Sequence, residues 1–376
     1  MLLVSEPTLG EQEKAALAAV IASNWITMGD RVRAFEAAFA AAHGADDAVA
    51  VNSCTAGLHL ALAALEIGPG DEVLVPSLSF VATANCVLHA GAAPVFVDID
   101  GPGRPLISIE DAARRCTERT RAVVVVHYAG AVADREAWRG FAAAKGLRLI
   151  EDAAQAAGAP GAGSFGDVAV FSFYGNKNMT TAEGGMVIAR DPAVLSIVRQ
   201  LRGHGMTSGT RERMDARTPG YDVTRLGWNY RLDELRAAIG SVQLQSLTKW
   251  NDRRAMLTRC YWEALAERCP GVQVPFANGS IASAYHILPA VLPEMTDRDR
   301  IMALMRDAGV QTTVHYPPIH TLSFYREKGP SVSLPRTEAF ARRELTLPLH
   351  PKLTEQDVVH VADALRRSLA WPGVRR

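Results

Sequence analysis

The strongest constraint on the fold is the regular alternation of short apolar runs with longer amphipathic segments in the first half of the chain. Each run is of strand length and is rich in Val, Ile and Leu, which is typical of strands buried on both faces. Helical segments over 108–116 and 134–145 separate several of these runs. The alternation predicts an α/β fold with a mostly parallel central sheet sandwiched by helices. The expected strands are 48–52, 72–76, 94–98, 122–127, 147–152, 168–173 and 186–189.

A second, smaller domain is expected in the C-terminal third of the chain. Helices over 11–22 and 33–43 precede the sheet, and a helix that begins at 233 continues to about 266. This long helix leads from a large domain, residues 1–249, into a small α+β domain, residues 250–376. The other expected elements are helices over 58–65, 192–201, 297–308 and 355–369 and strands over 287–292 and 311–315.

Composition limits the possible partners and the compartment. The chain of 376 residues has 40 Lys and Arg against 40 Asp and Glu, so its formal net charge is zero. A balanced charge argues against nucleic acid or an anionic membrane as a partner. The five cysteines are scattered and include no C-x-x-C pair, which is typical of reduced thiols. No apolar run reaches about 18 residues and the N-terminus resembles no signal peptide, so we expect a cytoplasmic protein.

One lysine follows the apolar run 168–173 after a polar turn. Taken alone, Lys177 fits a solvated surface charge better than a reactive amine. Two neighbours favour the amine, because Asp152 ends another expected strand and Ser172 lies on the strand that leads to the lysine. Ligands bind at the carboxyl ends of such strands. A lysine for a Schiff base, an acid for the pyridine nitrogen and a hydroxyl for the phosphate predict a pyridoxal 5'-phosphate (PLP) site.

Other positions are open to two interpretations from the residues alone. The small-residue turn 53–57 lies between a strand and a helix, which is a weak phosphate signal, and its Ser and Thr fit helix caps equally well. An aromatic residue such as Phe80 is more often a core residue than a cofactor contact. His127 ends a strand at the expected ligand edge, where it either lines the site or is a hydrogen-bonded core histidine.

Five short motifs, spread over nearly the whole chain, carry a family resemblance. In order and spacing they resemble the DegT/DnrJ/EryC1/StrS family of PLP-dependent sugar aminotransferases, which have the aspartate-aminotransferase (type I) fold. Asn176 departs from the pattern, since the family often has threonine there, but the assignment of Lys177 is unaffected. The motifs are Glu151-Asp-Ala-Ala-Gln155, Phe171-Ser-Phe with Lys177-Asn178, Glu183-Gly-Gly185, Gly227-Trp-Asn229-Tyr-Arg231 and Gln243-Leu244.

The resemblance implies a role for each residue of the cofactor site. Lys177 forms the Schiff base with PLP and then acts as general base and acid, while Asp152 keeps the pyridine nitrogen protonated. Gln155 hydrogen-bonds the phenolate oxygen of PLP, and the ring of Phe80 stacks on the cofactor. Asn229 reaches the phosphate of the neighbouring chain, which implies a homodimer with shared active sites; a local N-cap role is the alternative. The other implied phosphate contacts are Thr55, Ala56 and Ser172.

Two segments are implied to lie near the substrate. The first contains Trp25 and Thr27, although a buried tryptophan that closes a helix hairpin is an equal alternative. In the second, His315 and Tyr316 are expected to lie near the sugar rather than to serve a purely structural role. The histidines of this segment lack the cysteine or acidic partners of a zinc motif, so we expect no metal.

The resemblance also implies the reaction. An amino group moves from an amino acid, L-glutamate or in some relatives glutamine, to a keto sugar carried on a nucleotide. Segments 76–80, 126–130 and 218–221 look most like enzymes that aminate C4 of a 4-keto-deoxy sugar, and a cyclitol ketone or a 3-keto sugar is the alternative acceptor. Lys177 argues against the relatives that carry histidine there and dehydrate the sugar. A non-catalytic regulatory or interaction protein is a distant alternative, because the set of cofactor residues is intact.

Overall fold

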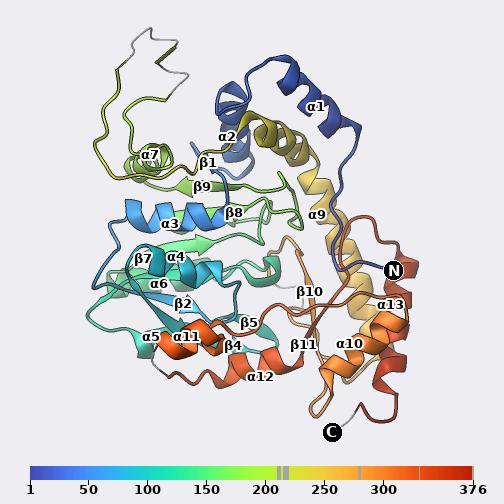
Figure 1. The fold of residues 1–376 in the computed structure, drawn as a ribbon. Helices are drawn as coiled ribbons and strands as arrows, with labels where there is room; N and C mark the ends of the chain where they lie inside the picture. The colour runs from blue at the N-terminus through green and yellow to red at the C-terminus, as the bar shows by residue number, and fades with distance from the viewer. Residues whose placement is uncertain (210–212, 215–219, 278–280, 330, 375–376) are drawn as a thin grey trace.

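A seven-stranded sheet forms the centre of the computed structural model, which describes residues 1–209, 213–214, 220–277, 281–329 and 331–374 (Figure 1). The strand order is β1-β9-β8-β7-β6-β2-β3. Neighbours from β8 to β3 pair in parallel, whereas β9 is antiparallel to both β8 and β1. The predicted mostly parallel α/β sheet is confirmed. The strands are β1 Val49–Val51, β2 Glu72–Pro76, β3 Ala93–Val97, β6 Thr120–Val126, β7 Arg148–Asp152, β8 Val168–Ser172 and β9 Gly185–Ala189.

Helices cover both faces of this sheet. Side chains of β6 alternate between the two cores, since Val123 and Val125 pack with α2, α5 and α6, while Val124 packs with α3, α4 and α7. Burial on both faces explains why these strands read as continuous apolar runs. The helices are α2 Asp30–Ala42, α3 Cys54–Ala64, α4 Ala82–His89, α5 Ile109–Arg115, α6 Arg135–Lys145 and α7 Pro192–Leu201.

A single 35-residue helix, α9 Glu234–Arg268, links the sheet to the C-terminal part of the chain (Figure 1). Its first half packs on α1 (Glu11–Ala22) and α2, and its second half packs on α13 (Glu355–Leu369). A separate core contains the second half of α9, α13, α10 (Arg298–Asp307) and the antiparallel pair of β10 (Leu288–Val291) with β11 (Glu344–Leu347). The division of the chain at residue 250 stays a prediction, and it falls inside α9.

Part of the predicted small domain packs against the sheet of the large one. The Ile319 amide donates to the carbonyl oxygen of Ser77 at 2.9 Å. The Tyr325 hydroxyl donates to the side-chain oxygen of Asn85 at 2.5 Å. The stretch from Ile319 through α11 (Ser323–Lys328) therefore lies along β2 and α4, whereas α12 (Pro335–Arg343) packs on β4 (Ile99–Gly101).

One expected strand is wrong, and three short strands were not predicted. Residues 311–315 form no strand; only Thr313 pairs there, as an isolated bridge with Thr346. The partner of β10 is β11, which we did not predict because it is only four residues long and begins with a glutamate. The short hairpin of β4 (Ile99–Gly101) and β5 (Arg104–Ile107) was missed for the same reason of length. Of the segment 218–221, residues 218 and 219 lie outside the described residues.

The helices of the described residues include none that is long and apolar enough to cross a bilayer. The N-terminal residues instead follow the small C-terminal core, where Leu2 forms a parallel bridge with Val310. The Leu2 amide donates to the carbonyl oxygen of Gly309 at 2.8 Å. Val374, the last described residue, packs in the same core as Leu2 and Val310.

Candidate active site

The carboxyl ends of β7 and β8 place the predicted acid and lysine at one edge of the sheet. Asp152 is the last residue of β7, Ser172 is the last residue of β8, and Lys177 lies in the turn that follows. β7 and β8 are parallel neighbours, so their ends meet. Asp152 and Lys177 lie close enough for each to shift the pKa of the other toward its charged form. The structure therefore brings together the pair that the sequence predicted.

Asp152 is a buried carboxyl group, only 5% exposed. The hydroxyl of Thr83 donates to its Oδ2 at 2.8 Å, and the amide of Ala154 donates to its Oδ1 at 3.2 Å. Burial raises the pKa of Asp152, and Thr83 and Lys177 only partly oppose this. A carboxylate in this position is stabilised by a cation set against it, which is what a protonated pyridine nitrogen provides.

Lys177 is held by contacts on both sides of its turn. Its amide donates to the carbonyl oxygen of Tyr174 at 2.9 Å. The side-chain amide of the next residue, Asn178, donates to Asn251 on α9 and to the carbonyl oxygen of Ala284, both at 2.7 Å. Burial lowers the pKa of Lys177. The sequence argument missed the anchoring role of Asn178, although Asn178 stands in the motif next to the lysine.

Gln155 and Phe80 flank this edge together with one tyrosine from the C-terminal segment. The Ala129 amide donates to Oε1 of Gln155 at 2.6 Å, and Nε2 of Gln155 donates to the Tyr316 hydroxyl at 2.6 Å. The rings of Phe80 and Tyr316 have centroids 6.1 Å apart. Phe80 is 59% exposed, so it is not a core residue. An exposed ring beside a buried acid is suited to stack on a flat ligand.

The first turn of α3 faces the same edge. Ser53 is the N-cap of this helix, and its hydroxyl accepts the amide of Ala56 at 3.1 Å. The cap interpretation is therefore correct for Ser53, and one of the two expected donors, the Ala56 amide, is already used. A side chain at Gly185 would place its Cβ 2.8 Å from the Cys54 amide nitrogen. Gly185 thus lets β9 approach the start of α3, which explains the glycine in the third motif.

The structure decides the alternatives left open for His127 and excludes one of the two for Asn229. His127 is fully buried, and its Nε2 lies 2.9 Å from Oε2 of Glu151, so it is a hydrogen-bonded core histidine. Asn229 does not cap α9, because the N-cap is Asp233, whose side chain accepts the Arg236 amide. The side chain of Asn229 is exposed in the single chain.

Trp25 lies at the corner between α2 and α9. A Cβ at Gly29 would lie 2.6 Å from the Trp25 ring nitrogen, so the indole packs directly on that glycine. Glu234, at the start of α9, accepts the amides of Gly29 and Val32 at 2.9 Å and thereby caps α2. This packing agrees with a tryptophan that closes a helix corner. Thr27 is exposed, and substrate contacts of both residues stay predictions.

His315 comes from the C-terminal segment, which packs against the strand ends through Tyr128. Its carbonyl oxygen accepts the Tyr128 hydroxyl at 2.6 Å, and its Nδ1 lies 2.8 Å from the hydroxyl of Thr346. Burial and the positive charge of Lys177 lower the pKa of His315 to about 4, so its imidazole is neutral. The described residues contain no group of three or more side chains arranged to hold a metal ion.

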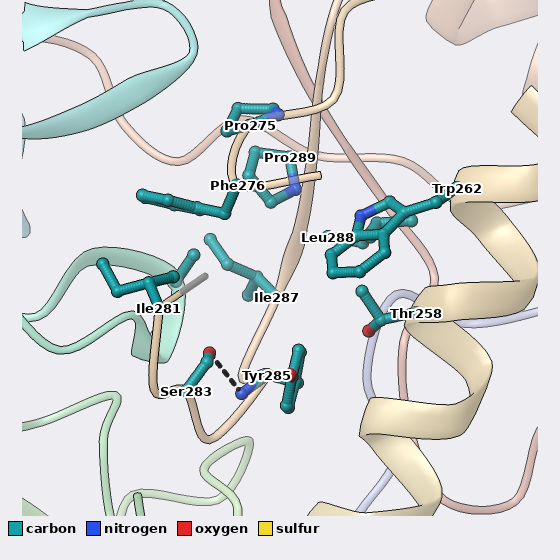
Figure 2. Close-up of a pocket in the computed structure, with 11 residues that line it drawn as sticks. Thr258, Trp262, Pro275, Phe276, Ile281, Ser283, Tyr285, Ile287, Leu288 and Pro289 are labelled. Atoms are coloured by element: carbon teal, nitrogen blue, oxygen red, sulfur yellow. Dashed lines mark hydrogen bonds between the residues drawn. The ribbon is translucent and has the colours of Figure 1, made fainter. Parts of the chain in front are cut away.

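A pocket lies between α9 and residues 275–276 and 281–289 (Figure 2). Its walls are mostly apolar, and the polar atoms of Thr258 and Trp262 that face this region have no hydrogen-bond partner among the described residues. Neither Lys177 nor Asp152 lines it. The pocket therefore has the character of a packing defect rather than of a reactive site.

The profile of the DegT/DnrJ/EryC1/StrS aminotransferase family matches residues 7–366. The chain belongs to this family. The strand-end lysine and acid described above lie within the matched region. The enzyme is thus a PLP-dependent aminotransferase of fold type I, and the non-catalytic alternative is excluded.

Solved structures of similar proteins agree over almost the whole length. The aminotransferase TlmJ from Streptoalloteichus hindustanus is 36% identical, with a TM-score of 0.91 over 98% of this chain and 99% of that chain. DesI, crystallised with its TDP-sugar product, is 34% identical, with a TM-score of 0.87 over 97% and 92%. The PMP-form of Spr1654, a putative sugar aminotransferase from Streptococcus pneumoniae, is 28% identical, with a TM-score of 0.90 over 97% and 98%.

Proposed function

We propose that this sugar aminotransferase moves an amino group from L-glutamate to a nucleotide-linked keto sugar, with Lys177 as the residue that holds PLP covalently. The observation that carries the proposal is the pairing of Lys177 with Asp152 at adjoining strand ends. Burial raises the pKa of Asp152 and lowers the pKa of Lys177, which favours the neutral form of each group. The charge of each partner acts in the opposite direction and stabilises the charged form of the other. Perturbed pairs of this kind are typical of catalytic sites.

The surrounding residues fit PLP. Asp152 would pair with the pyridine nitrogen, Phe80 would stack on the ring, and Nε2 of Gln155 would exchange its bond to Tyr316 for one to the phenolate oxygen. The phosphate would lie against the start of α3, where the helix dipole favours an anion. Thr55 and Ala56 from that turn, Ser172 from the end of β8 and Asn229 from a partner chain would complete its contacts.

Lys177 is the candidate for proton transfer. When bound, PLP supplies an electron sink for the carbanion formed at the α-carbon of the donor. With the donor bound to the cofactor, the amine of Lys177 would take the proton from that carbon and deliver it to C4′ of PLP. A lowered pKa suits this task, because a larger fraction of the amine is then unprotonated near neutral pH. Asn178 holds the turn and so limits where the amine can reach.

Family membership does not identify the ketone that accepts the amino group, so the acceptor and the aminated carbon are proposals of their own. C4 of a 4-keto-deoxy sugar is our first choice, and a 3-keto sugar or a cyclitol ketone is the second. DesI, solved with a TDP-sugar product, supports a nucleotide-linked sugar. His315 and Tyr316, with Trp25 and Thr27, are the residues we expect near this substrate. Glutamine in place of glutamate remains the alternative donor.

We also propose a cytoplasmic homodimer in which each site uses residues of two chains. The exposed side chain of Asn229 supports this, since Asp233 and not Asn229 caps α9. The neighbouring exposed side chains of Leu226 and Val223 are apolar and would be covered at such an interface.

The test is an absorbance titration of the purified enzyme reconstituted with PLP. L-glutamate should remove the visible band of the bound cofactor, and one member of a panel of nucleotide-linked keto sugars should restore it. Parallel panels of 3-keto sugars and cyclitol ketones would identify the alternative acceptors. If no visible band forms after PLP is added, the assignment of Lys177 is wrong. A band that only glutamine removes would replace the donor but keep the site.

A further inference from the structure

A buried carboxyl group lies behind His315 and is not used by the chemistry described above. Glu344 begins β11 and is fully buried. Its Oε2 accepts the backbone amide of His315 at 2.9 Å, and its Oε1 accepts the hydroxyl of Thr346 at 2.5 Å. The same hydroxyl lies 2.8 Å from Nδ1 of His315. Glu344, Thr346 and His315 thus form one continuous chain of hydrogen bonds.

The chain has two consistent arrangements of hydrogen. When Glu344 is ionised, the Thr346 hydroxyl must donate to the carboxylate. Nδ1 of His315 must then donate to Thr346, so Nε2 carries no hydrogen. When Glu344 is protonated, Oε2 is already occupied by a backbone donor, so the acid hydrogen lies on Oε1 and points to Thr346. The threonine then donates to Nδ1, and Nε2 carries the hydrogen. A hydroxyl can both donate and accept, which permits the reversal.

The other end of the chain is open. Nε2 of His315 makes no hydrogen bond to any described residue, and it is not among the fully buried polar atoms. The positive charge of Lys177 acts on this imidazole, which places it at the reactive side of the site. A group at Nε2 therefore meets an acceptor in one arrangement and a donor in the other.

We propose that Glu344, Thr346 and His315 form a proton relay in which the protonation state of Glu344 decides which ring nitrogen of His315 carries hydrogen. When Nε2 accepts a proton from the site, Nδ1 releases its proton to Thr346, and Thr346 passes its own to Oε1 of Glu344. The reverse order returns the proton. No imidazolium forms and no bond to carbon is made or broken. Glu344 and Thr346 act through His315 and are positioning residues.

The surroundings permit Glu344 to titrate near neutral pH. Burial raises the pKa of Glu344 to about 8, although Thr346, the His315 amide and the guanidinium of Arg298 oppose the shift. The phenol groups that feel its charge are those of Tyr128 and Tyr316. Lys177 is the charged group that acts on His315. His286 also lies near Lys177. Burial lowers the pKa of His286 and keeps its imidazole neutral, and His315 contributes to this lowering.

The relay has a use in the proposed function, on which this part of the inference rests. Replacement of the oxygen of a keto group by an amine releases that oxygen as water, so a proton must reach it. A histidine whose pKa is about 4 cannot supply one as an imidazolium near pH 7. A neutral imidazole that shifts between tautomers can, because the buried carboxyl group stores the proton.

The decisive experiment observes the tautomer directly in the enzyme without cofactor. Two-bond proton–nitrogen correlations of protein labelled with 15N-histidine distinguish Nδ1–H from Nε2–H, and a His315→Asn variant assigns the signal. In the wild type we expect Nε2–H at pH 6.5 and a change to Nδ1–H through a midpoint at about pH 8. Glu344→Gln should hold Nε2–H at every pH, because the amide donates permanently to Thr346. A tautomer that is the same in both proteins across the range would overturn the relay.

Two threonine variants and one control complete the test. Thr346→Ser keeps the hydroxyl and should keep the pH-dependent change, whereas Thr346→Val keeps the volume and should abolish it. Glu338→Gln alters a carboxylate that lies 3.4 Å from a different histidine, His320, and should leave the His315 signal as in the wild type. A Thr346→Val signal that still changes with pH would contradict the role of Thr346.

The kinetic counterpart separates the relay from the proposed function. With the accepted keto sugar, Thr346→Val should lower kcat about 100-fold, at the lower end of the range for a lost acid–base contribution. Glu344→Gln should remove the titration near pH 8 from the kcat profile. If no keto sugar is turned over, the proposed acceptor is wrong, while the tautomer measurement still decides the relay.

Discussion

The two walls of the site are built differently. On the cofactor wall, Asp152, Ser172 and Lys177 come from two neighbouring strand ends, within 26 positions of the chain. On the opposite wall, His315 is held by Tyr128 and by a pair of residues on β11. The first wall depends on local sequence and sheet geometry. The second exists only because the C-terminal segment folds back over the sheet.

The walls also differ in how burial acts on their charges. Without cofactor, burial raises the pKa of Asp152 and lowers the pKa of Lys177, so the charged forms of both groups are destabilised. A bound ligand with a positive group next to Asp152 would stabilise the carboxylate. On the opposite wall, burial lowers the pKa of His315 so that its imidazole is neutral, and its Nδ1 is hydrogen-bonded to the hydroxyl of Thr346. The cofactor wall therefore binds charged groups of a ligand, whereas the opposite wall orients hydrogen-bond donors and acceptors.

The largest effect should come from the cofactor wall. Lys177→Ala removes both the covalent anchor and the proton carrier, so we expect kcat to fall about 10⁴-fold or more. The measurement is single-turnover transfer from L-glutamate, with circular dichroism to verify the fold. The matched control is Lys145→Ala at the end of α6, which should keep wild-type turnover. Near wild-type turnover of Lys177→Ala would break the mechanism.

Asp152→Ala should come next. Loss of the carboxylate leaves the pyridine nitrogen without its partner and weakens the electron sink, so we expect kcat to fall about 10²- to 10³-fold. Thr83→Val tests the same contact more gently, because it removes one hydrogen bond to Asp152 and should raise the pKa of that residue further. A kcat in Asp152→Ala within a factor of two of the wild type would refute the role of the acid.

Acid stability probes the opposite wall. The pKa of His315 is about 4 in the folded protein, against about 6.5 for an unperturbed histidine, so folding favours the neutral imidazole. Its contribution is present above pH 6.5 and is lost as the pH falls toward 4, to a total of about 3 kcal/mol. Urea unfolding of the wild type and His315→Gln between pH 7.5 and 4.5 measures this. A variant with the same pH slope as the wild type would contradict the shift.

The smallest expected effect concerns the contact between chains. Asn229→Ala should weaken retention of PLP about tenfold, the size of one hydrogen bond to a charged group. Equilibrium dialysis of PLP gives the affinity, and sedimentation shows whether the dimer persists. An unchanged affinity in an intact dimer would remove Asn229 from the phosphate site.

Most of the sheet could be predicted because its strands are continuous apolar runs. The bounds of β2, α1, α7 and α13 agree with the expected 72–76, 11–22, 192–201 and 355–369. Elements of three or four residues, such as β4 and β11, were missed because so short a segment does not show the alternation of apolar and polar residues that identifies a strand. The strand expected over 311–315 was wrong, since the β-branched residues there form a single bridge rather than a ladder.

The candidate site divides in the same way. Lys177 and Asp152 could be found from sequence because each follows a strand directly and the sheet brings strand ends together. Thr83 and Asn178 could not be assigned their roles, since the partners of both lie about 70 residues away along the chain. The exposure of Phe80 and the burial of His127 were equally undecided, because a sequence does not state which side of an element faces solvent.

By itself, the sequence determined the family, the α/β sheet and the acid–lysine pair, because these depend on patterns within a strand and its following turn. Only the tertiary structure decided that Glu344 lies behind His315 and that Gln155 meets Tyr316. These contacts join residues from about 30 to 160 positions apart. They form because burial of apolar surface folds the C-terminal segment against the sheet, and the buried polar groups then require partners.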